Sequence, residues 1–174
     1  MTKYTVYDIN FTCMIKDWIY AEPLGLYVIV EAEGKTVRSV EMTAKKPRFE
    51  AQGSAFTRAL EKYFASGKDA FASYSPDYTG MTPFRKKVME ELRKVPAGST
   101  VTYGELASTV GHPGAARAVG NVMATNPVPL FVPCHRVVAT VGLGGFSGGL
   151  DVKRSLLRLE ATKDAKGTGT VRRS

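Results

Sequence analysis

The sequence predicts an α/β protein in two parts, a small antiparallel sheet with helices followed by a mainly helical domain. Strand-forming residues dominate the first third, and helical spacing of apolar residues appears after residue 54 and again after residue 82. The segment 73–83 between the two helical patterns is rich in turn formers. The 174 residues suit one ordinary domain or two small ones. We expect an N-terminal domain over 1–78 and a C-terminal domain over 79–174.

Strand and helix signals organise the N-terminal domain. The segments "YTVYDINFT" (4–12) and "LYVIVEAEGKTVRSVEM" (26–42) are rich in strand formers, and Gly34 predicts a hairpin turn. A helix is expected next, because Ser54 suits an N-cap and Gly67 suits the position after a last turn. The buried face of this helix is expected to carry Phe56, Leu60 and Phe64.

The C-terminal domain begins with three helix signals. Thr82 precedes a proline and predicts the start of the first helix. Thr102 and Glu105 form the capping-box pattern T-x-x-E at the start of a second, short helix. A third is expected over 115–125, after the turn "GHPG", and two short helices joined in this way suggest a helix-turn-helix. The expected buried residues of the first and third helices are Phe84, Val88, Leu92, Val95, Val119, Val122 and Met123.

Charge and cysteine content limit the classes of function. The formal net charge of +8 favours a polyanionic partner, although an indifferent basic surface stays open. No apolar run approaches the roughly 20 residues of a membrane span, and the N-terminus has no apolar signal segment. The two cysteines and two histidines match no zinc spacing, so we expect free thiols in the cytoplasm and no metal.

The third helix, "AARAVGNVMAT", surrounds one long cation, Arg117, with small residues. Alanine is the best helix former, so the pattern is compatible with an ordinary solvated helix. Alternatively, the small side chains let the backbone approach DNA closely. The residues alone do not decide between these two interpretations.

The stretch "PVPLFVPCHRVV" (127–138) places Cys134 and His135 side by side between apolar runs. A neighbouring base raises the reactive thiolate fraction of a cysteine. Successive side chains of a strand point to opposite faces, so a bridging water is the more credible proton path. Glu160, at the end of an apolar helical stretch, is the candidate that orients His135. The glycine-rich loop 141–149 is either a turn or a close fit around a flat ligand.

Several motifs resemble those of the O6-alkylguanine-DNA alkyltransferases. These motifs are "TYGELA", "ARAVGNVM", "NPVP", "VPCHRVV" and "FSGGL", in that order between residues 82 and 160. The resemblance implies a winged helix-turn-helix in the C-terminal domain. It also implies a monomer that binds double-stranded DNA in the minor groove and flips the damaged guanine out, because the reacting atom lies inside the base stack.

The resemblance implies a role for each residue of the chemistry. Cys134 would accept the alkyl group irreversibly, without a cofactor and in a single turnover. His135 would deprotonate Cys134 through a water, and Glu160 would orient His135. Tyr103 would donate to guanine N3, so that the base leaves as a neutral species.

The resemblance also implies residues that hold the base and the DNA. The backbone of Ser147 would donate to O6, and the Cys134 and Val137 carbonyls would accept from the exocyclic amine. The other implied substrate-site residues are Asn126, Pro129, Phe146 and Gly148. Arg117 would fill the space left by the flipped nucleotide. The other implied DNA-binding residues are Thr102, Ala116, Ala118, Gly120 and Arg136.

Two other classes of function remain in competition. A cysteine hydrolase could use Cys134, His135 and Glu160, but it leaves the helix-turn-helix unexplained. A DNA-binding regulator could use the cysteine as a sensor. The tail from about Lys163 is basic and glycine-containing, which suggests a mobile end.

Overall fold

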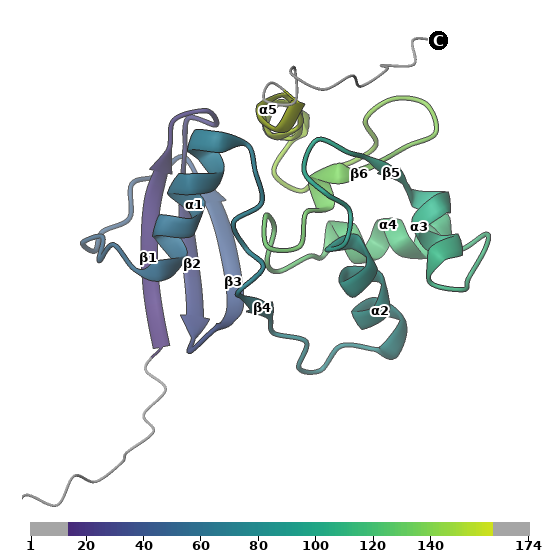
Figure 1. The fold of residues 1–174 in the computed structure, drawn as a ribbon, viewed down its shortest axis with the longest axis horizontal. Coiled ribbons are helices and arrows are strands. Elements are labelled where there is room, and N and C mark those ends of the chain that lie inside the picture. Colours follow the sequence, from purple (N-terminus) through teal and green to yellow (C-terminus); the bar gives the residue numbers. More distant parts are fainter. Residues whose placement is uncertain (1–13, 162–174) are drawn as a thin grey trace, which may run out of the picture.

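The computed structural model describes residues 14–161 (Figure 1). The strand expected over 4–12, Cys13 and the tail from Lys163 lie outside the described residues. Among the described residues no helix is long and apolar enough to cross a bilayer. Within residues 14–161 the fold has a small mixed sheet with one α-helix in its first half and four α-helices in its second half.

The sheet has the order β1-β2-β3-β4. β1 (Met14–Ala21), β2 (Leu26–Glu33) and β3 (Thr36–Thr43) form an antiparallel meander. The predicted hairpin between β2 and β3 is confirmed, with Gly34 at φ 58° in the left-handed region. β4 (Ser75–Pro76) pairs in parallel with β3, so the segment expected to be a plain linker contributes a short edge strand.

β1 was not predicted, and a buried carboxylate explains why. Its inward face carries Asp17 among apolar residues, which breaks the apolar alternation that indicates a strand. The carboxylate of Asp17 accepts hydrogen bonds from the Gln52 and Ser54 amides, at 2.7 Å each, and from the Thr57 hydroxyl at 2.9 Å. Asp17 therefore ties the sheet to the start of the first helix.

The helix α1 (Ala55–Ser66) packs on the sheet, and both predicted ends are confirmed. Ser54 caps it by accepting from the Thr57 amide, and Gly67 follows it at φ 68°. A Cβ on Gly67 would lie 2.4 Å from the carbonyl oxygen of Leu159. Only glycine therefore lets the end of α1 approach the last helix this closely.

The second half starts with α2 (Pro83–Leu92), α3 (Tyr103–Thr109) and α4 (Ala116–Ala124). The predicted caps at Thr82 and Thr102 are confirmed, and the capping box of α3 is complete. The inward residues of α4 are those expected, whereas α2 buries Met89 in addition to Val88 and Leu92. Phe84 and Val95 are only partly buried.

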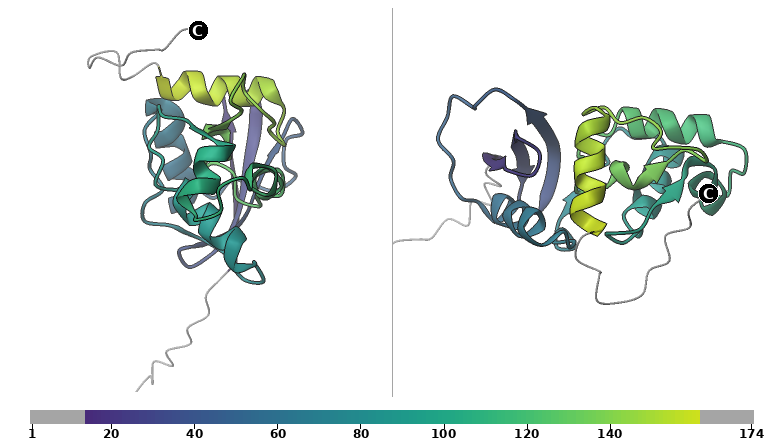
Figure 2. Two further views of the ribbon diagram at one scale, coloured as in Figure 1. Left: turned by 90° about the vertical axis from the view of Figure 1, so that its right-hand side faces the viewer. Right: turned by 90° about the horizontal axis from the view of Figure 1, so that it is seen from above.

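The end of the described chain brings the two halves together. β5 (Val101–Thr102) pairs in parallel with β6 (Val137–Val138), and the turn Cys134–Arg136 just before β6 is a 3-10 helix. The helix α5 (Leu150–Ala161) follows a long loop and contacts both α1 and this turn. Seen from above, α5 lies between the sheet and the helices of the second half (Figure 2).

Candidate active site

The segment before Cys134 is a rigid, buried loop. The side chain of Asn126 donates to the Val132 carbonyl at 2.8 Å and accepts from the Val128 amide at 3.1 Å. Leu130 is held at φ 75°, a left-handed conformation that leucine adopts only when its surroundings fix it. Cys134 itself is 2% exposed. The apolar run therefore serves to hold one thiol in a fixed place.

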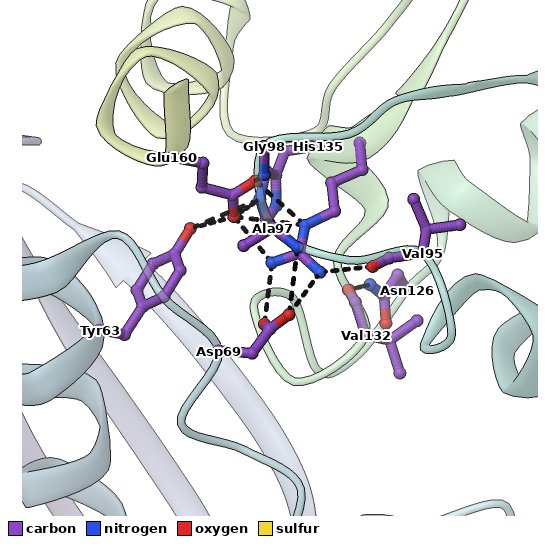
Figure 3. A network of polar contacts seen from close by, with 10 residues as sticks. Tyr63, Asp69, Val95, Ala97, Gly98, Asn126, Val132, His135 and Glu160 are labelled. Carbon is purple, nitrogen blue, oxygen red and sulfur yellow. Dashed lines mark hydrogen bonds and ion pairs between the residues drawn. The ribbon is translucent and has the colours of Figure 1, made fainter. Parts of the chain in front are cut away.

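A buried charge cluster lies behind this loop (Figure 3). We use the name charge cluster for Tyr63, Asp69, His135, Arg136 and Glu160. His135 Nε2 lies 2.8 Å from Glu160 Oε1, and Arg136 Nη2 lies 2.8 Å from the same oxygen. Arg136 also pairs with Asp69 at 2.8 Å. The contact predicted between His135 and Glu160 is confirmed.

The charges of the cluster fix the tautomer of His135. Burial opposes ionisation of Glu160, but hydrogen bonds and charges from His135 and Arg136 outweigh burial and lower its pKa to about 2. The ionised carboxylate can only accept, so Nε2 of His135 carries the proton and donates it. Burial lowers the pKa of His135, although Glu160 acts in the opposite direction. The lowered pKa keeps the imidazole neutral.

The other ring nitrogen of His135 is free to act as a base. Nδ1 is buried and has no hydrogen-bond partner among residues 14–161. Since Nε2 carries the ring proton, Nδ1 holds a lone pair. An acceptor of this kind next to a cysteine in the chain is what a proton relay from the thiol requires.

A buried lysine completes the surroundings of Cys134. Lys153 is fully buried and donates to the carbonyls of Val137 at 2.6 Å and Gly145 at 3.0 Å. Burial raises the pKa of the Cys134 thiol, while the amide of Asn126 and the charge of Lys153 act in the opposite direction. Lys153 was missed by the sequence analysis, although it lies three residues before Leu156 and seven before Glu160 on the buried face of α5.

Cys134 opens onto an apolar pocket of about 270 Å³. Two glycines allow aromatic rings to close around it. A Cβ on Gly144 would lie 2.8 Å from the ring of Tyr103, and a Cβ on Gly148 would lie 2.9 Å from that of Phe146. The glycine-rich loop therefore fits closely around the protein's own aromatic rings, whereas its fit around a flat ligand stays a prediction. The lining residues are Tyr103, Gly120, Met123, Ala124, Cys134, Gly145, Phe146 and Ser147.

The structure brings only some of the expected substrate-site residues to the pocket. Phe146 and Ser147 line the pocket, and Gly148 adjoins it. The carbonyl of Val137 already accepts from Lys153, with one lone pair left for a ligand. Asn126 and Pro129 are buried in the supporting loop and are not among the lining residues.

Arg136 was expected to bind DNA, and this is wrong. Its side chain is 1% exposed. Its guanidinium is occupied by Glu160, Asp69 and the carbonyl of Val95. An arginine with every donor group engaged inside the protein has nothing to offer a phosphate. Its role is to balance the buried charge of Glu160.

The other expected DNA-binding residues lie on α4, except Thr102, which caps α3. Arg117 and Ala118 are exposed, while Ala116 and Gly120 are partly buried. Thr102 uses its hydroxyl in the capping box of α3. Arg117 has no hydrogen-bond or ion-pair partner within 14–161, so its side chain is available to a ligand.

The fold and the site define a protein with a buried cysteine beside an apolar pocket and a neutral histidine, and comparisons with known proteins identify its family. The family model described as "6-O-methylguanine DNA methyltransferase, DNA binding domain" matches residues 83–162. The chain is 36% identical over 157 residues to a methylated-DNA–protein-cysteine methyltransferase of Salmonella typhimurium, covering 80% of this chain and 92% of that protein. The chain belongs to the methylated-DNA–protein-cysteine methyltransferase family.

Another relative and two solved structures extend this result. The Shigella flexneri methyltransferase is 45% identical over 102 residues, which span 58% of this chain and 59% of that protein. The crystal structure of Mycobacterium tuberculosis OGT in complex with DNA has a TM-score of 0.70 at 32% identity, covering 85% of this chain and 93% of that one. The O6-methylguanine-DNA methyltransferase of Pyrococcus kodakaraensis has a TM-score of 0.63 at 28% identity, covering 86% and 98%.

Proposed function

We propose that this protein repairs O6-alkylguanine in double-stranded DNA by moving the alkyl group irreversibly to its own Cys134. One observation carries the proposal. Cys134 faces an apolar pocket on one side and adjoins a neutral histidine with an unpartnered ring nitrogen on the other. The family membership and the names of the relatives agree with this reaction.

The reaction is a displacement at the alkyl carbon. The thiol proton of Cys134 passes to Nδ1 of His135 through a water, and the sulfur then attacks the alkyl carbon. The bond from that carbon to O6 breaks, its electron pair moves into the guanine, and Tyr103 donates to N3 so that guanine leaves neutral. Glu160 holds His135 in the required tautomer before the proton transfer and stabilises the imidazolium that the transfer forms.

The flipped base would lie flat in the pocket against Phe146. The backbone amide of Ser147 donates to O6, and the carbonyls of Cys134 and Val137 accept from the exocyclic amine. Gly148 gives the loop the space to close on the base. Asn126 and Pro129 do not contact the base, but they keep the loop before Cys134 in place.

The DNA would be held by a winged helix-turn-helix made of α3, α4 and the β5–β6 pair. The small residues of α4, Ala116, Ala118 and Gly120, allow close approach to the minor groove. Arg117 then fills the gap left by the flipped nucleotide, and Thr102 lies at the start of α3 beside the same surface. We further propose two domains, meeting near residue 78, in a cytoplasmic monomer that needs no cofactor.

A transfer assay tests the proposed function. Duplex DNA with one labelled O6-methylguanine should transfer label until it reaches one equivalent per active protein, because a thioether on an unactivated carbon has no route back. The added methyl mass should lie on the peptide that carries Cys134. Release of methanol, or more than one equivalent of product, would identify a hydrolase instead.

Cys134→Ser is the matching variant. It should abolish label transfer and still bind the lesion duplex, since the pocket and α4 are unchanged. The change from sulfur to oxygen leaves the packing nearly intact, so the melting temperature serves as the control for folding. Residual transfer by this variant would move the assignment to Cys13.

A further inference from the structure

A side chain from the first half of the protein enters the charge cluster. Tyr63, on α1, is fully buried, and its hydroxyl donates to Glu160 Oε1 at 2.7 Å. His135 Nε2 and Arg136 Nη2 approach the same oxygen, each at 2.8 Å. Figure 3 shows the Tyr63 side chain pointing toward Glu160, and its hydroxyl lies 3.4 Å from His135 Nε2. One carboxylate oxygen therefore receives donors from both halves of the chain.

We infer that Tyr63 is a positioning residue for the alkyl transfer. Its hydroxyl holds Glu160 in place and offsets part of the negative charge of this carboxylate, and in this way it sets the basicity of His135. This inference rests on the proposed function. It gives the first half of the protein a part in the chemistry, beyond supporting the second half.

The hydroxyl of Tyr63 has a purpose that packing does not explain. The ring packs edge-on against Phe64 and at a tilt to Phe71, with centroids 5.2 and 5.3 Å away, and a phenylalanine would pack in the same way. A buried hydroxyl is unfavourable unless it is bonded, so its presence points to the bond with Glu160. Burial and the charge of Glu160 raise the pKa of Tyr63, which keeps the hydroxyl protonated and donating.

Contacts at the end of α1 hold the Tyr63 hydroxyl in place against α5. Gly67 places the end of α1 against the backbone of Leu159 and Glu160. Two residues later Asp69 pairs with Arg136 on the side away from Glu160. The segment from Tyr63 to Asp69 therefore meets the charge cluster at two points, one on the carboxylate and one on the guanidinium.

The sign of the electrostatic effect follows from the groups around His135. These groups are Tyr63 from α1, Asp69 after α1, Arg136 in the same turn and Glu160 from α5. The hydroxyl dipole of Tyr63 offsets part of the negative charge of Glu160. Without that dipole, Glu160 stabilises the imidazolium of His135 more strongly, and His135 becomes harder to deprotonate.

Tyr63→Phe is the test, with two independent measurements. The ring nitrogens of His135 should show by NMR titration a pKa raised by about half a unit or more. The chain has only two histidines, so the second one, His112, serves as the internal reference. The acid limb of the pH profile of alkyl transfer from O6-methylguanine duplex should move to higher pH, so that the rate falls about threefold on that limb and less at pH 7, because half a pKa unit is a factor of about three. Dissociation of the duplex should not change.

Tyr74→Phe is the matched control. Its hydroxyl donates to the Ala55 carbonyl at 2.9 Å, outside the charge cluster, so this variant should leave both the titration of His135 and the pH profile unchanged. An unshifted titration of His135 in Tyr63→Phe would overturn the inference, as would a rate loss that is equal at all pH values and follows the unfolded fraction. If the wild-type protein transfers no label, the proposed function fails, while the titration still decides the role of Tyr63.

Discussion

The two sides of the Cys134–Arg136 turn differ in polarity and in access to solvent. The pocket side is apolar and open, and glycines there let the rings of Tyr103 and Phe146 approach the chain. The other side is closed and ionic, with Glu160 and Arg136 buried against each other. The thiol lies between a surface that accepts a flat apolar group and a cluster that handles a proton.

The difference shows how one short turn can serve two purposes. A pocket that must admit a base has to be open, and an open site cannot hold a histidine in one fixed tautomer against water. The closed side can hold the histidine in one tautomer, because burial strengthens the hydrogen bond from His135 to Glu160. Changes on the closed side should therefore alter the pH dependence of transfer, and changes on the pocket side should alter the reactivity of the thiol itself.

Glu160→Gln should give the largest effect on the closed side. The amide no longer fixes the tautomer of His135, and the buried Arg136 loses its buried counterion and keeps only the partly exposed Asp69. We expect about a hundredfold slower transfer and about 3 kcal/mol lower free energy of unfolding, measured by label transfer and by urea titration. Glu91→Gln removes a surface pair with Lys94 and should change neither quantity.

The acid dependence of stability gives this prediction a second measurement. The pKa of Glu160 is lowered on folding to about 2 from 4.5. Its contribution to stability is therefore complete above about pH 4.5 and is lost as the pH falls toward 2. The wild type should lose stability over this range, and Glu160→Gln should lose less. Equal acid sensitivity in the two proteins would contradict the assigned ionisation of Glu160.

Lys153→Met should slow transfer less than Glu160→Gln does, and its effect should depend on alkaline rather than acidic pH. Loss of the cation removes a contribution that lowers the pKa of Cys134, so that pKa should rise. Transfer at pH 7 should slow about tenfold, for a rise of about one unit, and should recover as the pH is raised. The control is Arg154→Met, which removes an exposed cation from the same helix. A loss in Lys153→Met that alkaline pH does not recover would assign the lysine to holding the Val137 and Gly145 carbonyls alone.

The sequence predicted what local signals determine. The helix ends at Ser54, Gly67 and Thr82 follow from capping chemistry within a few residues, and the structure has them where expected. The adjacent thiol and base indicated Cys134 and His135, and the end of an apolar helical stretch indicated Glu160; the structure places His135 against Glu160.

The sequence did not predict what depends on distant contacts. Tyr63 and Asp69 join the charge cluster from the first half of the chain, and nothing in the residues around them indicates that destination. The resemblance assigned Arg136 to the DNA, and the residues around it in the sequence do not indicate that its side chain is buried. Asp17 concealed β1 for a related reason, since three of its hydrogen-bond partners lie 35 or more residues away.

Arg117→Ala should give the smallest chemical effect, because Arg117 lies on neither side of the turn. Its side chain is exposed on α4 and would act only where a nucleotide must leave the duplex. We expect repair of duplex O6-methylguanine to slow by less than about tenfold, since a filling side chain offsets only part of the few kcal/mol that flipping costs. Transfer from the free base O6-methylguanine needs no flipping and should not change. Lys94→Ala removes an equal charge from another exposed position and controls for the loss of general attraction to phosphate. Glu160→Gln and Lys153→Met should slow both substrates equally, so the ratio of duplex to free-base rates separates α4 from the two sides of the turn. A ratio that stays constant in Arg117→Ala would remove this arginine from the flipping step.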